Sequence, residues 1–469
     1  MPDRDTAGVA VAFVTGSQTT VPNPALIAMR NSGLAHLLSV SGLHIGLAVG
    51  ILFFLIRAGL ALVPPVALRW PIKKWAAVLA LLGAAFYMLL SGASVPVVRS
   101  FVMAGIVLLA VIVDRQPISM RPVAIAAVAV LLIWPDSLVG PSFQLSFAAI
   151  VALTAVWEEL SPRRTSDLGP ARRGLRWLSD LALSSIIATL ATAAFAIYHF
   201  NRLTGYGVIA NMLAVPITGF WVMPWLILAL ILMPFGLESW ALEPAGWGIS
   251  AILWIAQNVS DWPGAVALLP AMPQPGLALV SLGGLWLCLW RKRWRYLGLG
   301  AIAAGLATIL LTRAPDILVA EDARLVAIVE ADGTLRLSSG RADRFAANEW
   351  LRRFGQDEHL SWSANVAGAD PRLSCNQGDC RFRVAGHSIA ILQHADDMSA
   401  ACADSDLVIV LERTDALCRA PVIGPDRLAQ LGGHAIRVGE GGIEIETVRD
   451  IQGQRPWVAT SPDDGEDDD

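Results

Sequence analysis

The chain has 469 residues, of which 55% are hydrophobic and only 16% charged; its mean hydropathy is +0.56 and its net charge is −4. This composition excludes a soluble globular chain and indicates an integral membrane protein. Residues 1–35 lack the basic start and apolar core of a cleavable signal. We expect them to form an extracytoplasmic lead-in segment with a short strand followed by a helix. The segment reads as the middle of a protein, which leaves open that an amino-terminal domain is missing.

Ten apolar stretches follow that are long enough, or nearly so, to cross a bilayer. They lie at 36–63, 75–91, 95–113, 123–134, 141–157, 181–200, 206–236, 245–259, 276–290 and 296–312. The fourth is short, and Pro216 and Pro224 in the seventh predict a broken or re-entrant helix. We therefore expect a polytopic α-helical membrane protein with about ten transmembrane helices, forming a domain over 36–314.

Basic residues gather in the odd-numbered loops between these stretches. They are Arg69, Lys73, Lys74, Arg115, Arg121, Arg163, Arg164, Arg172, Arg173, Arg176, Arg291, Lys292, Arg293 and Arg295. The even-numbered loops contain only Arg202. Because short cytoplasmic loops are rich in Lys and Arg, ten spans place both chain ends on the extracytoplasmic face.

The composition changes at about residue 314. Residues 1–314 carry 20 basic and 11 acidic side chains, whereas the rest carries 15 and 28. The alternating stretches "RLVAIVEADGTLRLSS" and "SDLVIVLE" predict strands, and "ADRFAANEWLRRFG" predicts a helix that ends at Gly355. We expect a small soluble α/β domain over 315–455 and a disordered acidic tail over 456–469.

Four of the five cysteines lie in this second domain: Cys375, Cys380, Cys402 and Cys418. An even number in an oxidising compartment favours two disulfides, most simply Cys375 with Cys380 and Cys402 with Cys418. Two other pairings remain open. A zinc site is the alternative, although the spacing matches none of the usual ligand pairs.

The first apolar stretch opens with "HLLSVSGLHIGLAVG", which is unusually polar and rich in glycine. Gly42, Gly46 and Gly50 form two overlapping G-x-x-x-G units, which favour close helix packing. His36 and His44 support a second interpretation, because ionisable residues within spans usually face water or the bundle interior. These residues alone leave packing and an aqueous cavity equally favoured.

Further polar residues occur in later stretches. Arg99 lies about one turn inside the third, either snorkelling to the head groups or facing a polyanion path. Gln144, Ser146 and Asn211 could simply form interhelical hydrogen bonds. Every carboxylate of the apolar region lies at an expected span end or in a loop, which weighs modestly against a proton- or cation-coupled carrier.

"GLAHLLSVSGLHIGLAVG" resembles the signature of the ComEC competence protein family, and "SGASVPVVRSFVMAG", "PSFQLSFAAI" and "NMLAVPITGF" continue the resemblance in order. It covers about residues 8–290. The resemblance implies an inner-membrane channel that admits one strand of transforming DNA. It also implies an extracytoplasmic DNA receptor and a cytoplasmic ATP-driven motor or DNA-binding proteins as partners. It places eight residues near the conduit: His36, Ser41, Gly42, His44, Arg99, Gln144, Ser146 and Asn211.

The chain departs from the family pattern at both ends. Many members begin with an OB-like domain, which is missing here. Many end in a metallo-β-lactamase-like domain with an H-x-H-x-D-H metal cluster, and His359, His387, His394 and His434 do not form that pattern. We therefore expect no metal, no cofactor and no enzymatic activity, and a structural or protein-binding role for this domain.

Two other functions remain open from the sequence, a small-molecule or ion transporter and a scaffolding remnant without transport activity. The sequence has no G-x-x-x-x-G-K-[ST] phosphate loop, so a DNA channel would need a separate motor. The sequence leaves the oligomeric state open.

Overall fold

The computed structural model describes residues 3–116, 119–160, 169–339, 341–357, 360–362, 372–376 and 379–453. The chain forms two compact units. The helical unit comprises Met1–Ala267 and Met272–Ile309, and the sheet unit comprises Leu268–Ala271 and Leu310–Asp469. The acidic tail expected over 456–469 lies outside the described residues.

The lead-in segment is helical, so the strand expected near its start is wrong. It forms α1 (Arg4–Thr15) and α2 (Asn23–Asn31). Asp3 caps α1, because its Oδ1 accepts a hydrogen bond from the backbone N–H of Thr6 at 2.7 Å. Val9, Ala12 and Phe13 are fully buried at helical spacing. Burial on one helix face therefore outweighs the β propensity of this valine-rich stretch.

Within the part of the chain that the structure describes, seven helical segments are long and apolar enough to cross a membrane. They are Gly42–Ala61 (α3), Ile72–Leu90 (α5), Val95–Ile112 (α6), Pro141–Leu160 (α8), Ala171–Phe200 (in α9, Pro170–Phe200), Gly207–Phe235 and Arg293–Leu311 (ending in α14, Leu297–Leu311). Two shorter apolar helices are α7 (Met120–Ile133) and α13 (Gln274–Leu289). A multi-pass membrane protein follows, whereas the expected count of ten spans is not confirmed.

The expected eighth span is not among these helices. It corresponds to α12 (Ser239–Ser260), which packs against α1, α2, α10 and α11. Ile249, Ile252 and Ala256 are fully buried there. Its opposite face is exposed at Trp240, Trp247 and Trp254, so α12 is buried in protein on one side only.

The seventh stretch is continuous rather than broken. α10 (Gly207–Ile217) passes through a π-helical turn, Thr218–Val222, into α11 (Met223–Leu232). Thr218 donates its hydroxyl to the carbonyl of Ala214 at 2.8 Å. A local π turn re-pairs backbone groups that the prolines leave without partners, so the chain does not need to break.

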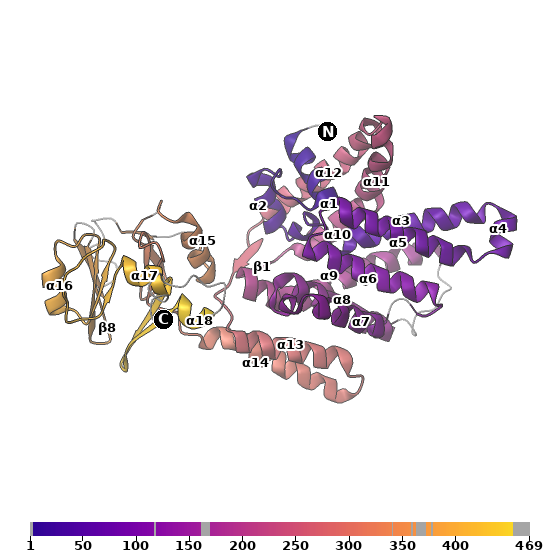
Figure 1. Ribbon diagram of the computed structural model, residues 1–469. Coiled ribbons are helices and arrows are strands. Elements are labelled where there is room, and N and C mark those ends of the chain that lie inside the picture. The colour runs from indigo at the N-terminus through magenta and orange to yellow at the C-terminus, as the bar shows by residue number, and fades with distance from the viewer. Residues whose placement is uncertain are drawn as a thin grey trace, which may run out of the picture. The chain divides into compact units, whose positions relative to one another are not determined.

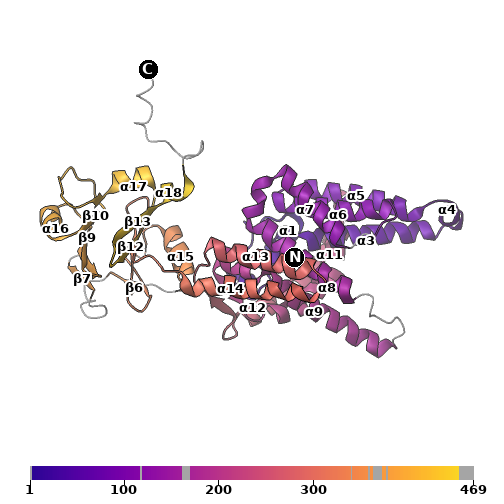
Figure 2. The ribbon, with the colours of Figure 1, turned by 90° about the horizontal axis from the view of Figure 1, so that it is seen from below.

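In the helical unit, α3 packs against α5 and α6, α6 against α7, and α8 against α9 (Figure 1). α13 and α14 run side by side (Figure 2). Short elements connect the helices: η1 (Ala35–Leu37), α4 (Pro64–Arg69), η2 (Pro135–Val139), β1 (Arg202–Thr204), η5 (Met233–Phe235), β2 (Val266–Leu268) and η6 (Arg293–Tyr296).

The sheet unit is an α/β domain with two sheets. One sheet has the order β13-β12-β3-β4-β5-β6 and the other β11-β10-β9-β8-β7. Their strands are β3 (Ile317–Val319), β4 (Val326–Val329), β5 (Leu335–Leu337), β6 (Leu360–Ser361), β7 (Leu373–Asn376), β8 (Asp379–Val384), β9 (His387–Leu392), β10 (Leu407–Val410), β11 (Val422–Ile423), β12 (His434–Gly439) and β13 (Gly442–Thr447). The strands predicted from the two alternating stretches are thereby confirmed as β4, β5 and β10.

Helices cover the outer faces of the two sheets. Ile328 and Ile436 of the first sheet share a core with Phe382 and Ile409 of the second. α15 (Arg344–Arg353) covers the first sheet and α16 (Met398–Asp404) the second, giving four layers (Figure 2). α17 (Pro425–Leu431) and α18 (Val448–Gln452) complete the unit. The helix predicted to end at Gly355 is confirmed as α15, but a metallo-β-lactamase-like fold is not.

Both disulfides favoured by the sequence are present. Cys375 and Cys380 lie directly opposite each other on β7 and β8, and Cys402 of α16 is joined to Cys418. Cys288 of α13 is free.

Candidate functional site

The polar residues singled out from the sequence lie at one end of the helical unit. Ser41, Arg99 and Gln144 stand before or within the first turns of α3, α6 and α8, and Asn211 in the first turns of α10. α9 runs in the opposite sense, so its last turn reaches the same end. We call Ser41, His44, Arg99, Ser142, Gln144 and His199 the polar layer.

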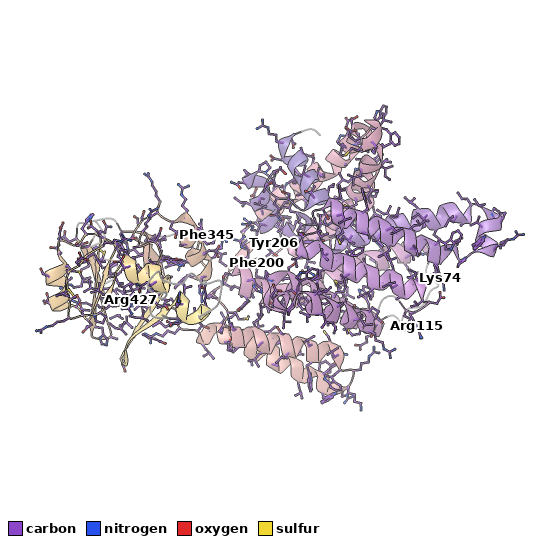
Figure 3. The ribbon with its side chains drawn as sticks, in the orientation of Figure 1. Lys74, Arg115, Phe200, Tyr206, Phe345 and Arg427 are labelled. Carbon is purple, nitrogen blue, oxygen red and sulfur yellow. A yellow bond between two sulfur atoms is a disulfide. The ribbon has the colours of Figure 1, made fainter. Side chains whose placement is uncertain are left out.

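The other end of these helices is basic and tied together by ion pairs. Lys74 pairs with Asp114 at 2.6 Å, joining the start of α5 to the end of α6. Glu158, near the end of α8, accepts from the backbone N–H of Met120 at 2.8 Å and from Arg291 at 2.5 Å. Lys74 and Arg115 lie at this end, and Phe200 and Tyr206 toward the other (Figure 3).

His44 is fully buried in the polar layer. Its Nδ1 lies 3.2 Å from the hydroxyl of Ser41, and its ring meets Phe13 edge-on with 5.3 Å between the centroids. Nε2 has no hydrogen-bond partner among the described residues. A buried polar atom without a partner is costly, so this nitrogen marks a place where water or a ligand would bind.

Arg99 carries a buried positive charge. The residue is 5% exposed, and its Nη1 donates to Ser142 at 2.6 Å. Nε has no partner, and Arg99 forms no ion pair with a carboxylate among the described residues. Arg99 therefore does not extend to the head groups; its guanidinium is buried and keeps an N–H donor at Nε without an acceptor among the described residues. An uncompensated buried charge is costly and favours an anion beside it.

Gln144 links α8 to α9. Its Nε2 donates to the carbonyl of Leu138 at 2.9 Å, and its Oε1 lies 2.8 Å from Nε2 of His199. The sequence reading missed His199 and Ser142. The signal for both was available: His199 is a histidine one residue from the end of an apolar stretch, and Ser142 lies beside Gln144 in "PSFQLS".

The remaining predicted residues are spread around this layer. His36 in η1 is exposed, with Nδ1 3.1 Å from the carbonyl of Gly33. Asn211 is partly buried, and its Oδ1 has no partner among the described residues. Ser146 lies half a turn beyond Gln144 on α8 and is partly buried. Among the described residues, no hydrogen bond joins these three side chains to the polar layer.

The predicted G-x-x-x-G packing is not what the structure shows. A methyl group on Gly42 would lie 3.9 Å from the hydroxyl of Ser100, but on Gly46 or Gly50 it would meet no described atom within 4 Å. The close approaches occur elsewhere, between α13 and α14. A methyl group on Gly305 would lie 2.6 Å from the carbonyl oxygen of Gly276. Small residues pack helices only where two helices happen to cross, which spacing alone does not specify.

In the sheet unit, His434 is buried, 2% exposed, with Nδ1 2.8 Å from the carbonyl oxygen of Gly432. His387 is partly buried near Asp406, and His394 is exposed near Glu412. Within the described residues, no three His, Cys, Asp or Glu side chains lie close enough to share a metal. His359 lies outside the described residues.

Comparisons with known proteins agree with the sequence motifs. The model of the Competence protein family matches residues 13–294. ComE operon protein 3 of Bacillus subtilis is 28% identical over 55% of this chain and 30% of its own length. YcaI of Escherichia coli is 30% identical over 61% of this chain and 40% of its own length. Recombination protein 2 of Haemophilus influenzae is 28% identical over 54% of this chain and 32% of its own length. No solved structure matches. The matches thus span less than half the length of these relatives.

Proposed function

The chain belongs to the competence protein family, and on that premise we propose that it is a channel of the bacterial inner membrane that admits one strand of transforming DNA. The observation that carries the proposal is Arg99, a buried guanidinium in a span with no carboxylate partner among the described residues. A passing phosphate would supply the missing negative charge. The DNA strand would then move past Arg99, because a single phosphate contact is too weak to hold it.

The polar layer has the chemistry for this role. It contains an arginine, two histidines, two serines and a glutamine, and no carboxylate. A lumen for a polyanion needs hydrogen-bond donors and should lack fixed negative charge. Asp180 does lie inside α9, which begins at Pro170, earlier than expected; it is twenty residues from the polar end of that helix.

The orientation follows from charge. Basic loops are retained in the cytoplasm, so the end with Lys74, Arg115 and Arg291 would face inward and the polar layer outward. The lead-in segment enters α3 at the polar end, and α14 runs from the basic end back toward it. Both flanking parts would then be extracytoplasmic. An extracytoplasmic receptor would deliver DNA, and a cytoplasmic ATP-driven motor or DNA-binding proteins would draw in the strand.

The test is the delivery of labelled duplex DNA to the cytoplasm of a transformable host that carries the wild-type gene, a deletion or Arg99→Gln. The deletion should leave DNA outside the inner membrane. Arg99→Gln should reduce cytoplasmic DNA at least about tenfold, because the loss of a charge-assisted phosphate contact removes about 1.5–3 kcal/mol.

The matched control is Arg57→Gln, which removes an arginine from the same bundle near the opposite end of α3. It should leave uptake at the wild-type level. Equal uptake by the deletion strain would disprove translocation. Equal uptake by Arg99→Gln at equal protein abundance would remove the role of Arg99 and leave family membership as the only support.

A further inference from the structure

A cavity of about 1270 Å³ opens at the basic end of the helical unit, far along α6 from the polar layer. α6 and α7 form its apolar walls through Ile106, Leu109 and Ile125. Arg115, Arg121 and Arg291 line its charged part. Its volume exceeds the roughly 300–1,000 Å³ of pockets that hold drug-sized ligands, so it has room for a head group and the first part of its acyl chains.

Aromatic residues place this end at the membrane boundary. Trp286, Trp290 and Trp294 form a cluster beside Arg291, with ring centroids 4.3 to 5.4 Å apart. A second pair, Trp70 and Trp75, stacks at the start of α5, where Lys74 is paired with Asp114. Tryptophan concentrates at head-group level in membrane proteins. The charged part of the cavity therefore lies at the level of lipid phosphates.

The acidic residues of the cavity already have partners, whereas two of its arginines form no ion pair with any residue that the structure describes. Asp114 is paired with Lys74, and Glu158 accepts from Arg291 and from the backbone of Met120. Arg115 and Arg121 are exposed and form no ion pair with a described residue. A net positive charge is left facing the cavity, which favours an anionic occupant.

The walls indicate what kind of anion binds. Leu109 is 51% exposed, Val113 62% and Ile125 58%, and all three line the cavity. They lead from the arginines along α6 and α7 toward the middle of the membrane. Nucleic acid would gain nothing from such a surface, whereas acyl chains would cover it. Basic pockets between transmembrane helices with this combination bind anionic lipid head groups.

We propose that this cavity binds an anionic phospholipid, with its phosphate between Arg115 and Arg121 and its acyl chains along α6 and α7. The site is separate from the polar layer and does not depend on the proposed transport. A bound lipid would connect the α6–α7 hairpin to the end of α13, where Arg291 lines the same cavity.

The test uses the full-length protein, purified and depleted of lipid in a zwitterionic detergent. Native mass spectrometry measures the binding of dioleoyl phosphatidylglycerol, dioleoyl phosphatidylcholine and glycerol phosphate. The wild type should bind phosphatidylglycerol in preference to both others. Arg115→Gln with Arg121→Gln should weaken that binding roughly 30-fold, given about a factor of five for each arginine near an anionic surface.

The matched control is Arg69→Gln with Arg293→Gln, which removes the same charge from the same end outside the cavity; it should bind like the wild type. Leu109→Trp, which keeps the arginines and fills the cavity, should also weaken binding, whereas Leu82→Trp on the exposed face of α5 should not.

Three results would overturn the proposal. They are unchanged phosphatidylglycerol binding in both the double-arginine and Leu109→Trp variants, equal binding of phosphatidylcholine, and glycerol phosphate binding as tight as the lipid. Displacement of the lipid by a single-stranded oligonucleotide that binds the wild type but not the Arg115→Gln, Arg121→Gln variant would also contradict it. That result would assign the cavity to a nucleic-acid path.

Discussion

At the scale of single residues, His44 and Arg99 share an unusual property: each is buried and each keeps a nitrogen without a partner among the described residues. Each such atom costs on the order of 1–3 kcal/mol of stability. An apolar side chain of similar size would avoid that cost. His44 beside Ser41 and Arg99 beside Ser142 therefore fit positions where the chain gives up stability for a contact with something that is not protein.

His434 predicts how the stability of the sheet unit depends on pH. Burial lowers the pKa of its imidazole, and the hydrogen bond to the carbonyl of Gly432 only partly opposes this. The unfolded chain, with the ordinary pKa of about 6.5, therefore takes up a proton more readily than the folded one. The free energy of unfolding of the sheet unit therefore keeps its full value above pH 6.5. It falls as the pH drops below 6.5, by at most about 1.4 kcal/mol per pH unit.

Denaturant unfolding of the sheet unit at pH 7.5 and pH 5.5, followed by hydrogen exchange in β12, measures this difference. His434→Gln should flatten the pH dependence in that range, because glutamine does not titrate. His394→Gln is the control, since the side chain of that histidine is 72% exposed. An equal loss of stability between pH 7.5 and pH 5.5 in the wild type and in the His434→Gln variant would show that His434 is not the titrating group.

At the scale of elements, the hairpin of α13 and α14 depends on its glycines. The carbonyl oxygen of Gly276 stands 2.6 Å from the position a methyl group would take on Gly305. Gly305→Val should therefore force the two helices apart and cost about 1–3 kcal/mol, as overpacking does. Thermal unfolding of the purified protein measures the loss.

Gly300→Val is the matched control on the same helix, because a methyl group on Gly300 would meet no described atom within 4 Å. It carries the same change in helix propensity, so any difference between the two variants reports packing. Equal thermal unfolding midpoints for Gly305→Val and Gly300→Val would mean that α13 and α14 are not in contact at Gly305.

The sequence predicted elements well where periodicity decides and poorly where tertiary contacts decide. Apolar stretches located α3, α5 and α6, because a helix that faces lipid must be apolar along its length. They also counted α12, which is not among the seven helices long and apolar enough to cross a membrane, and they missed the helix at α1, where burial overrides the β propensity of the valines. The prolines of Gly207–Phe235 predicted a break that a π turn removes.

The candidate site could be predicted only in part for a related reason. Arg99 and Gln144 stand out as polar residues in apolar surroundings, so the sequence singles them out. Ser142 and His199 complete the network only because α6, α8 and α9 bring them within hydrogen-bond distance of those two residues. Partners of this kind follow from helix packing, which single-sequence periodicity does not contain.

At the scale of the whole molecule, two units with separate cores predict separate responses to a local change. Cys402→Ser with Cys418→Ser should destabilise the sheet unit by about 2–4 kcal/mol, since the disulfide closes a loop between α16 and the segment before β11. Hydrogen exchange measured by mass spectrometry should become faster in β9 and β10. Exchange in the helices of the other unit should not change.

Cys288→Ser serves as the control, because that cysteine is free and lies in α13 of the helical unit. It should leave exchange in β9 and β10 as in the wild type. If the double cysteine variant sped up exchange in α3 and α6 as much as in the strands, the two units would have to unfold as one.

The two ends of the helical unit are held by different forces. At the basic end, Lys74 with Asp114, Arg291 with Glu158 and Arg295 with Glu159 join four loops through ion pairs that water reaches. At the polar end, Arg99 with Ser142 and Gln144 with His199 join helices through hydrogen bonds that are partly buried. Dissolved ions screen exposed charge pairs far more than buried hydrogen bonds. A rise in the cell's ionic strength therefore weakens the contacts between helices at the basic end and leaves those at the polar end nearly unchanged.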